Sequence, residues 1–398
     1  MQEDKGKIIL FSGGVETLTY FSKQLAAYFE QQGYAVFFYD LRDPSSAKRV
    51  KRFIKPKKTV LFTFNFLGLS GEEGAYEEDR GYLWEQYDIP CYNMLVDHPL
   101  YYVDRFEQLP KDSHLIAIDR DHEQFLRRYY GEYDILGFCP LAGTSLFTDG
   151  MEQTKEEWVS NRSLPVLFVG NYNDYRQYES YITRINDEYT AFYRGIISEL
   201  LHHPEKTLTE VARRHCVREM GELSTKEWRI CYQNLNFIDL YIRFYERERV
   251  LRAFVEAGIE VHVYGNGYET FEKVSSPFLH IHGGTDSYGC LTKMQQAKIS
   301  LNVMPWFRDG AHDRVFNAMA NGSVSMTDDS RYLREILTDG RHLVYYDVAH
   351  PEAAAKEAKS LLQQTDKLYE IARNGYEIAT GKHLFCHRAK WLLSQMFS

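Results

Sequence analysis

The chain has 398 residues, of which 44% are hydrophobic, enough to bury the cores of two domains. Its formal net charge of -9 argues against a surface that coats nucleic acid, so we expect no nucleic-acid partner. The six cysteines lack metal-ligand spacing and no apolar run reaches about 20 residues, which favours a cytoplasmic protein with reduced thiols and at most peripheral membrane contact.

Short apolar runs alternate with helical patterns in the first part of the chain, which is typical of a parallel α/β sheet. After the first strand, apolar residues share one face of a helix expected over residues 17–32, which stops at Gly33. The expected strands are residues 7–11, 35–39, 59–64, 90–96, 114–118 and 134–139. These elements predict a Rossmann-like domain over residues 1–160.

A glycine-containing loop, SGGVET at residues 12–17, joins the first strand to this helix. Gly13 and Gly14 allow close approach by a phosphate or sugar, whereas the absent G-x-G-x-x-G spacing argues against NAD. The loop also resembles the SGGxDS loop of ATP pyrophosphatases, with Glu16 and Thr17 in place of Asp and Ser, which would imply an ATP-dependent adenylating enzyme. Three interpretations of this loop remain open: it borders a ligand cleft, it binds ATP, or it is a structural turn.

A basic run, KRVKRFIKPKK, follows at residues 48–58. It has the charge to face an anionic substrate or a membrane surface, but we expect a solvated loop between strands.

Two later strands of this domain are followed by acidic and histidine side chains. Asp97 and His98 follow the strand at residues 90–96, where either would serve as the base that takes a proton from an acceptor hydroxyl. An orienting structural role for His98 remains equally open. Asp119 and Asp121 follow the strand at residues 114–118 and are candidates for an acceptor site. The alternative is a helix N-cap formed by Asp119 or Asp121, and for Asp121 the cap is the favoured interpretation.

A second Rossmann-like domain is expected over residues 161–380, with the boundary near Asn161. A strand at residues 165–169 leads into a loop with Asn171, and a strand at residues 260–264 leads into Gly265 and Asn266. Residues 182–248 are largely helical by pattern and too long for one crossover, so we expect a helical insertion. Residues 381–398 are expected to form a helix on the first domain.

The most informative segment is SLNVMPWFRDGAHDRVFNAMANGSVSMTD at residues 300–328. It predicts a strand at 299–303, a polar loop, a helix at 313–321 capped by Asn321 and Gly322, and a strand at 323–327. Polar loops at the carboxyl ends of parallel strands are where ligands bind, and a helix N-terminus favours an anion. His312 and Arg314 add donors for phosphate oxygens. An ordinary strand-helix-strand unit has the same pattern.

From HDRVFNAMANGSVSMTD through the 331–333 helix, a strand at residues 339–346 and NGYEIATGKH at 374–383, the chain resembles the donor domain of group 1 glycosyltransferases. Within these it is most similar to the CgeB-like branch, named for a spore-maturation protein. The resemblance covers residues 259–397. It implies a GT-B fold, in which two Rossmann-like domains face a cleft and the second holds a nucleotide sugar without a required metal.

One departure from the family bears on the donor site. Many group 1 enzymes carry two glutamates with seven residues between them, and this chain has Asp309 and Asn317 at those positions. The Asn317 amide keeps the ability to contact the donor ribose, but the charge is lost. A non-catalytic protein that binds a nucleotide sugar therefore remains an alternative.

The favoured prediction is a glycosyltransferase that moves a sugar from a nucleoside-diphosphate sugar, with UDP as the expected nucleoside diphosphate, to a hydroxyl acceptor that we leave unspecified. Charge on the leaving diphosphate calls for fixed donors. The residues expected to bind the diphosphate are Gly310, His312, Asp313 and Arg314. The nucleoside and sugar are expected to contact Asn171, Gly265, Asn266, Met304, Trp306 and Asn317.

Overall fold

The structure, a computed structural model, describes residues 5–148, 150–271, 275–304 and 307–397. The chain forms two compact units. The first unit comprises Met1–Leu141 and Phe385–Ser398, and the second comprises Ala142–Leu384. The boundary that the sequence pattern places near Asn161 therefore lies inside the second unit.

The first unit contains a six-stranded parallel sheet in the order β2-β1-β3-β6-β7-β8. Its strands are β1 (Lys7–Ser12), β2 (Ala35–Asp40), β3 (Thr59–Phe64), β6 (Cys91–Leu95), β7 (Ser113–Ala117) and β8 (Asp134–Phe138). A small hairpin of β4 (Tyr76–Glu77) and β5 (Gly81–Tyr82) stands apart from this sheet. All six expected strands are present, and none of their ends is shifted by more than one residue.

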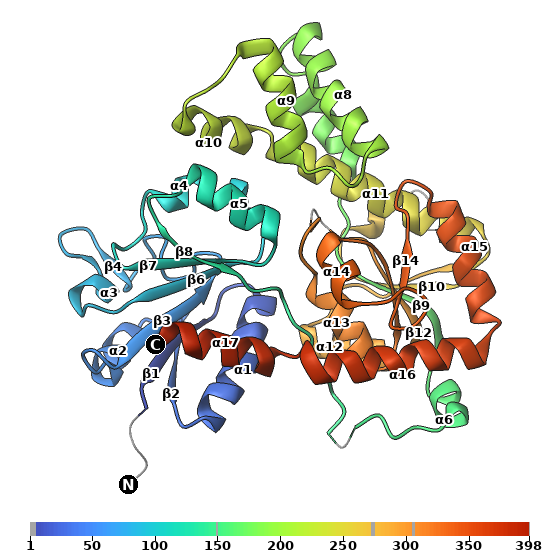
Figure 1. Ribbon diagram of the computed structural model, residues 1–398, viewed down its shortest axis with the longest axis horizontal. Coiled ribbons are helices and arrows are strands. Elements are labelled where there is room, and N and C mark those ends of the chain that lie inside the picture. Colours follow the sequence, from blue (N-terminus) through green and yellow to red (C-terminus); the bar gives the residue numbers. More distant parts are fainter. Residues whose placement is uncertain (1–4, 149, 272–274, 305–306, 398) are drawn as a thin grey trace. The chain divides into compact units, whose positions relative to one another are not determined.

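Helices on the two faces complete the first unit. They are α1 (Glu16–Gln31), α2 (Ser46–Phe53), α3 (Leu83–Gln86), η1 (Pro99–Tyr102), α4 (Val103–Phe106), α5 (Arg120–Tyr129) and α17 (Phe385–Met396). The last of these packs on the first, and the rings of Phe21 and Phe385 lie 5.0 Å apart (Figure 1). Near the end of α17, Phe397 lies 4.7 Å from the ring of Tyr34.

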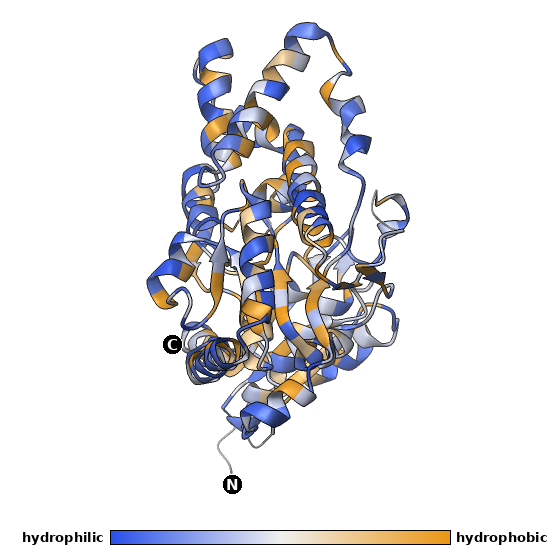
Figure 2. Ribbon diagram, turned by 90° about the vertical axis from the view of Figure 1, so that its right-hand side faces the viewer, coloured by the Kyte–Doolittle hydropathy of each residue, from blue (hydrophilic) through white to orange (hydrophobic). Residues whose placement is uncertain are grey.

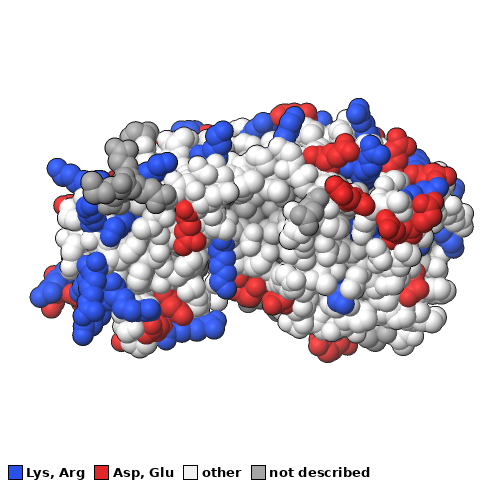
Figure 3. All heavy atoms as spheres, turned by 90° about the horizontal axis from the view of Figure 1, so that it is seen from below, with Lys and Arg blue, Asp and Glu red and all other residues white. Residues whose placement is uncertain are grey.

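The basic run after β2 is a helix rather than the expected loop. Four of its side chains, Lys48, Arg49, Lys51 and Arg52, are exposed on α2. Val50 is fully buried and the ring of Phe53 lies 5.3 Å from that of Phe37, so apolar contacts fix the helix to the unit while its charges stay in water. Figure 3 shows Lys and Arg side chains gathered on this unit.

The second unit also contains a six-stranded parallel sheet, in the order β11-β10-β9-β12-β13-β14. Its strands are β9 (Leu164–Val169), β10 (Val261–Tyr264), β11 (Leu279–Ile281), β12 (Ala297–Asn302), β13 (Val324–Asp328) and β14 (Val344–Tyr346). The last strand is shorter than the expected 339–346, because residues 339–343 form a turn in which Gly340 has a φ of 64°. The residues of this turn are not extended, so they cannot pair with the neighbouring strand.

The helices of the second unit fall into two groups. Those beside the sheet are α6 (Lys155–Ser160), η3 (Tyr268–Thr270), α12 (Ser287–Gln296), α13 (Asp313–Ala320), α14 (Arg331–Ile336), α15 (Pro351–Leu362) and α16 (Thr365–Lys382). The expected insertion between β9 and β10 consists of η2 (Tyr175–Tyr178), α7 (Glu179–Ile182), α8 (Asp187–His202), α9 (Leu208–Met220), α10 (Thr225–Asn234) and α11 (Asn236–Glu256). In Figure 1, α8, α9 and α10 project from the sheet of this unit.

The core of the second unit lies around its sheet. Val166, Val261, Ile299 and Val324 are fully buried, one from each of four neighbouring strands. Figure 2 shows the strands as hydrophobic stretches and the helices with alternating hydrophobic and hydrophilic faces. Among the described helices, none combines the length and hydrophobicity needed to cross a bilayer.

Candidate functional site

The order of the second sheet reverses between β9 and β12, which start opposite halves of the sheet. Ligands of open α/β sheets bind at such a reversal, at the carboxyl ends of the strands. The loop at residues 170–174 follows β9, and the loop at residues 303–312 follows β12 and leads into α13. The sheet topology therefore brings Asn171 and the 312–314 segment to the place where a ligand is expected.

Three side chains converge on the backbone that follows β9. Arg314 Nη1 donates to the carbonyl of Val169, the hydroxyl of Tyr268 donates to Gly170 at 2.7 Å, and Arg247 Nη1 donates to Asn171. Three successive carbonyl groups thus each accept a hydrogen bond from a different element. This convergence holds two guanidinium groups at one edge of the sheet.

Close backbone contact joins the loops after β9 and β10. A Cβ on Gly265 would lie 2.1 Å from the carbonyl oxygen of Gly170, so only glycine fits there. The Asn171 side-chain oxygen accepts from the Asn266 backbone N–H at 3.0 Å, and the Tyr172 N–H donates to the Asn266 carbonyl at 2.9 Å. The structure therefore brings Asn171, Gly265 and Asn266 together, as a paired loop.

His312 is the N-cap of α13, and its ring contacts both of the residues that follow it, Asp313 and Arg314. Its Nδ1 lies 2.6 Å from Asp313 Oδ1 and 3.2 Å from the N–H of Arg314. Nδ1 accepts from this N–H, as an N-cap does, and from Arg314 Nε at 3.3 Å, and Nε2 lies 3.3 Å from Arg314 Nη2. Both ring nitrogens of His312 are used within the chain, so it orients Arg314 rather than offering a phosphate donor.

The charges of this segment follow from its burial. Burial lowers the pKa of His312, and the neighbouring Arg314 lowers it further, which keeps the ring neutral. Burial alone would raise the pKa of Asp313, but His312 and Arg314 outweigh it and hold that pKa below its usual value. The segment at neutral pH is therefore a carboxylate, a neutral imidazole and a guanidinium in series.

Arg247 and Arg314 form the main electrostatic feature of the site. Burial lowers the pKa of Arg247 to about 9, and the charge of Arg314 acts in the same direction. Burial also lowers the pKa of Arg314. The Arg247 guanidinium lies 5.5 Å from the ring of Phe168 and 5.6 Å from that of Phe244. Two desolvated cations that bond to neutral carbonyls would gain from an anion placed between them.

Two buried acids lie near this pair. Arg308 Nη1 lies 3.5 Å from Asp328 Oδ2, and Asp328 Oδ1 accepts from the backbone N–H of Met304 at 2.7 Å. Burial raises the pKa of Glu246 to about 7, with Arg308 opposing and Asp328 reinforcing the effect. Burial raises the pKa of Asp328 to about 6.

These raised pKa values give stability a pH dependence. Between the pKa of about 4 for an unfolded carboxyl group and about 7, the folded chain binds more protons than the unfolded chain, so stability falls as pH rises. We expect the free energy of unfolding of the second unit to fall by up to about 3 kcal/mol between about pH 5 and about pH 8. In Glu246→Gln most of this slope should vanish, whereas the exposed Glu377→Gln keeps it. Urea unfolding at each pH measures the slope, and equal slopes in wild type and Glu246→Gln would contradict the assignment.

The remaining predicted residues of the second unit have structural partners. Asn317 is 9% exposed; its Oδ1 accepts from the Thr144 N–H at 2.8 Å and its Nδ2 donates to Asp313 at 2.9 Å. Met304 is buried, and the Gly310 carbonyl accepts from Ser330 at 2.6 Å. Trp306 lies outside the described residues. Asn317 thus anchors residues 144–146 on α13 in this structure.

In the first unit, Asp97 and His98 lie at the carboxyl edge after β6. Asp97 Oδ2 accepts from Asn65 Nδ2 at 3.0 Å and from the Tyr102 hydroxyl at 3.1 Å. His98 Nδ1 accepts from the Leu100 N–H at 3.1 Å, so the neutral ring carries its proton on Nε2. Asn65 has a φ of 48°, a strained conformation for a residue other than glycine, and it fixes Asp97 in place.

The other first-unit candidates lie on two helix starts. Gly13 has a φ of 83°, and a Cβ there would lie 2.2 Å from Asp40 Oδ1; Gly14 follows it, and Glu16 is the first residue of α1. Asp119 is fully buried and caps α5 by accepting from the N–H groups of Asp121 and His122 at 2.7 and 3.3 Å. Of the two N-cap candidates, Asp119 is the cap, whereas Asp121, for which a cap was the favoured interpretation, lies within the first turn.

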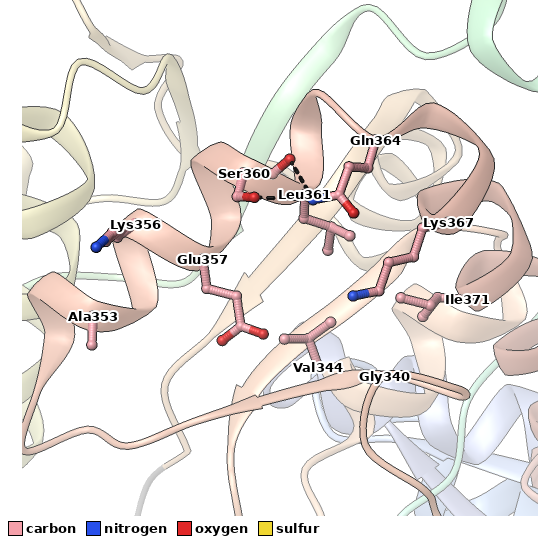
Figure 4. Close-up of a pocket in the computed structure, with 10 residues that line it drawn as sticks. All are labelled: Gly340, Val344, Ala353, Lys356, Glu357, Ser360, Leu361, Gln364, Lys367 and Ile371. Carbon is pink, nitrogen blue, oxygen red and sulfur yellow. Dashed lines mark hydrogen bonds between the residues drawn. The ribbon is translucent and has the colours of Figure 1, made fainter.

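A separate pocket of about 390 Å³ lies between β14, α15 and α16. Figure 4 shows Glu357 and Lys367 extending toward its middle. It is lined by Gly340, Val344, Ala353, Lys356, Glu357, Ser360, Leu361, Gln364, Lys367 and Ile371. None of the described candidate site residues is among them, so this pocket is distinct from the arginine pair.

Sequence reasoning missed Arg247, Glu246 and Tyr268. The first two lie in ERER of α11, and charges in a helix are usually solvated. A signal was present, because Asp239, Arg243 and Glu246 follow the spacing i, i+4, i+7 and share one helix face. Asp239 and Glu246 are 1% and 5% exposed, so this charged face points inward.

Comparisons with known proteins agree with this architecture. Residues 247–394 match a family model described as glycosyl transferase-like. No curated protein matches the chain. Among solved structures, sucrose-phosphate synthase from Thermosynechococcus elongatus superimposes with a TM-score of 0.56 at 12% identity, covering 98% of this chain and 99% of that one.

Two further solved structures have the same coverage of 98% and 99%. Anabaena HepE in complex with UDP and glucose has a TM-score of 0.55 at 8% identity. An alpha-glucosyltransferase in complex with UDP-glucose and DNA containing an abasic site has a TM-score of 0.56 at 12% identity. With its two parallel six-stranded sheets, the chain therefore has the predicted GT-B fold.

Proposed function

We propose that this protein transfers a sugar from a nucleoside-diphosphate sugar, with UDP as the nucleoside diphosphate, to a hydroxyl group. The observation that carries the proposal is the pair of guanidinium groups at the strand reversal between β9 and β12, from the buried Arg247 and the half-buried Arg314. Both lie within the residues that match the glycosyl transferase-like model. Two structures of similar fold were solved with UDP-glucose or with UDP and glucose.

The chemistry of the reaction explains why two cations are needed. As the bond from the sugar to the diphosphate breaks, negative charge accumulates on the phosphate oxygens and the sugar acquires oxocarbenium character. Arg247 and Arg314, together with the N-terminus of α13, would stabilise that charge. Their present carbonyl partners are neutral, so a diphosphate competes for the same N–H groups with a stronger, charge-assisted interaction.

Removal of the acceptor proton is assigned to Asp97 or His98 of the first unit. Asp97 Oδ2 accepts the hydrogen bonds from Asn65 and Tyr102, so Oδ1 is the atom that we propose as the base. His98 would have to release the Leu100 N–H or its Nε2 proton to act in this way. We further propose that the chain belongs to the CgeB-like branch, acts in the cytoplasm and needs no metal for donor binding.

Calorimetric titration of the full chain with UDP, GDP, ADP and ATP tests this function. We expect UDP to bind without metal and Arg247→Met to weaken binding about tenfold or more, the scale of one lost charge-assisted hydrogen bond. Arg249→Met, two residues along the same helix, should bind UDP as the wild type does. Binding of ATP alone that is lost in Gly13→Ala would instead support an adenylating enzyme.

A second readout separates a transferase from a binding protein. Slow release of UDP from bound UDP-sugar, or its acceleration by a hydroxyl acceptor, is expected of a transferase. Tight UDP-sugar binding with no release of UDP under any acceptor would support the non-catalytic alternative.

A further inference from the structure

Three histidines and a glutamate gather on the outer strands of the second sheet, on β10 and β11. Side chains two residues apart on a strand share one face, so Glu260, His262 and Tyr264 align along β10. In the parallel register His262 pairs with His280 and Val263 pairs with Ile281, which puts His280 and His282 on the same face of β11. The cluster therefore arises from strand periodicity and register.

The nitrogen and oxygen atoms of this cluster lie at distances suited to one metal ion. Glu260 Oε1 lies 2.8 Å from His262 Nε2 and 3.4 Å from His280 Nε2. All three ligand atoms lie within 4.8 Å of one another. A tetrahedral zinc ion with bonds of about 2.0–2.1 Å needs ligand atoms roughly 3.3 Å apart. The 3.4 Å between Glu260 Oε1 and His280 Nε2 matches this spacing.

His282 supplies the outer support that metal-binding histidines require. Its Nε2 lies 3.0 Å from His262 Nδ1, and the two rings are stacked with centroids 5.2 Å apart. The ring of Tyr264 stacks on the other side of His282 at 4.5 Å. A hydrogen bond at Nδ1 fixes the orientation of His262 and leaves Nε2 for a metal.

The three proposed ligands differ in their exposure to solvent. The His262 side chain is 12% exposed, whereas those of His280 and Glu260 are 40% and 47% exposed. An ion therefore has access, and water can occupy a fourth position. Glu260 precedes β10 and the loop at Gly265 follows it, so this cluster lies toward the opposite end of the strand from the arginine pair.

We propose that Glu260, His262 and His280 bind a divalent transition-metal ion, with His282 as the positioning residue. Two imidazoles and one carboxylate suit Zn²⁺, Cu²⁺ or Ni²⁺ and are poor ligands for Mg²⁺, which prefers oxygen. The ion would tie β11, an edge strand of three residues, to β10. This site does not rest on the proposed sugar transfer, and either can fail alone.

Titration of the full, untagged chain with Zn²⁺ tests the site. We expect one Zn²⁺ per chain, no binding of Mg²⁺ at the same concentration, and weaker binding at lower pH, because protons compete for the histidines. His262→Ala and His280→Ala should weaken binding by at least about 100-fold, and His282→Phe by about 10- to 100-fold.

A matched control is His350→Ala, which removes an exposed histidine whose Nδ1 lies 2.8 Å from Asp347 without a second imidazole from another strand. It should leave Zn²⁺ affinity unchanged. Circular dichroism confirms that each variant is folded, and the exposed His280 provides the variant least disruptive to folding. Zn²⁺ affinity that is the same in His280→Ala and wild type, or no saturable binding by wild type, would overturn the proposal.

Discussion

Replacing Arg314 with alanine is expected to weaken UDP binding by about 30-fold or more, which corresponds to about 2 kcal/mol. The reason is that Arg314 is one of two guanidinium groups at the strand reversal, and it is oriented by His312 and held against Val169. Lysine should not restore the affinity, because it lacks the planar set of donors that contacts both groups. Calorimetry with UDP in the absence of metal measures the loss.

The control for this variant is Arg341→Ala, which removes an exposed arginine of the same unit. It should bind UDP as the wild type does. Thermal unfolding provides a second control, because Arg314→Ala removes one of two like charges and is not expected to destabilise the unit strongly. Unchanged UDP affinity in a folded Arg314→Ala protein would contradict the proposed donor site.

The largest effect on stability is expected from Arg162→Ala. The Arg162 side chain is 2% exposed and donates to the carbonyls of Met294, Gln295, Ala297 and Asn321 at 2.5 to 3.1 Å. Met294 and Gln295 lie in the last turn of α12, Ala297 begins β12 and Asn321 is the C-cap of α13. Removing the guanidinium takes one hydrogen bond from each of these four carbonyls, at a cost of about 3–5 kcal/mol.

Urea unfolding of the second unit measures this loss. Burial lowers the pKa of Arg162 to about 9, so the group is charged at neutral pH, where the measurement is made. Arg162→Lys should recover only part of the stability, because an ammonium group cannot reach four divergent carbonyls. Arg373→Ala, which breaks an exposed pair with Glu377, should change stability by less than about 1 kcal/mol. A similar small change in Arg162→Ala would refute the role assigned to it.

Local patterns in the sequence predicted most of the fold. The strands of both sheets are apolar runs, and the end of α13 follows from Gly322, whose φ of 70° confirms the expected left-handed cap. The apolar run before residues 312–314 likewise predicted that this segment follows the end of a strand. The sequence left the N-cap of α5 open between Asp119 and Asp121, since both have the side chain of an N-cap, and the structure has it at Asp119.

Contacts between distant residues were beyond local patterns. Asn317 was expected to face the donor, but its partner Thr144 lies 173 residues away in sequence. Arg247 reaches Asn171 across 76 residues, and nothing in either segment alone indicates that pairing. The histidine cluster depends on the register in which β10 pairs with β11. The pattern of hydrophobic residues does not determine that register when both strands are this short.

The place of α17 has a consequence for synthesis on the ribosome. The helix begins at Phe385 and packs on α1, which begins at Glu16, so the first unit needs the last residues of the chain to cover that face. The second unit is continuous, and all of its residues are made before α17 emerges. Domains generally fold as units during synthesis. Of the two units, the one whose residues are mostly made first is therefore completed after the other, and a chain that stops before residue 385 would leave Phe21 without its contact with the ring of Phe385.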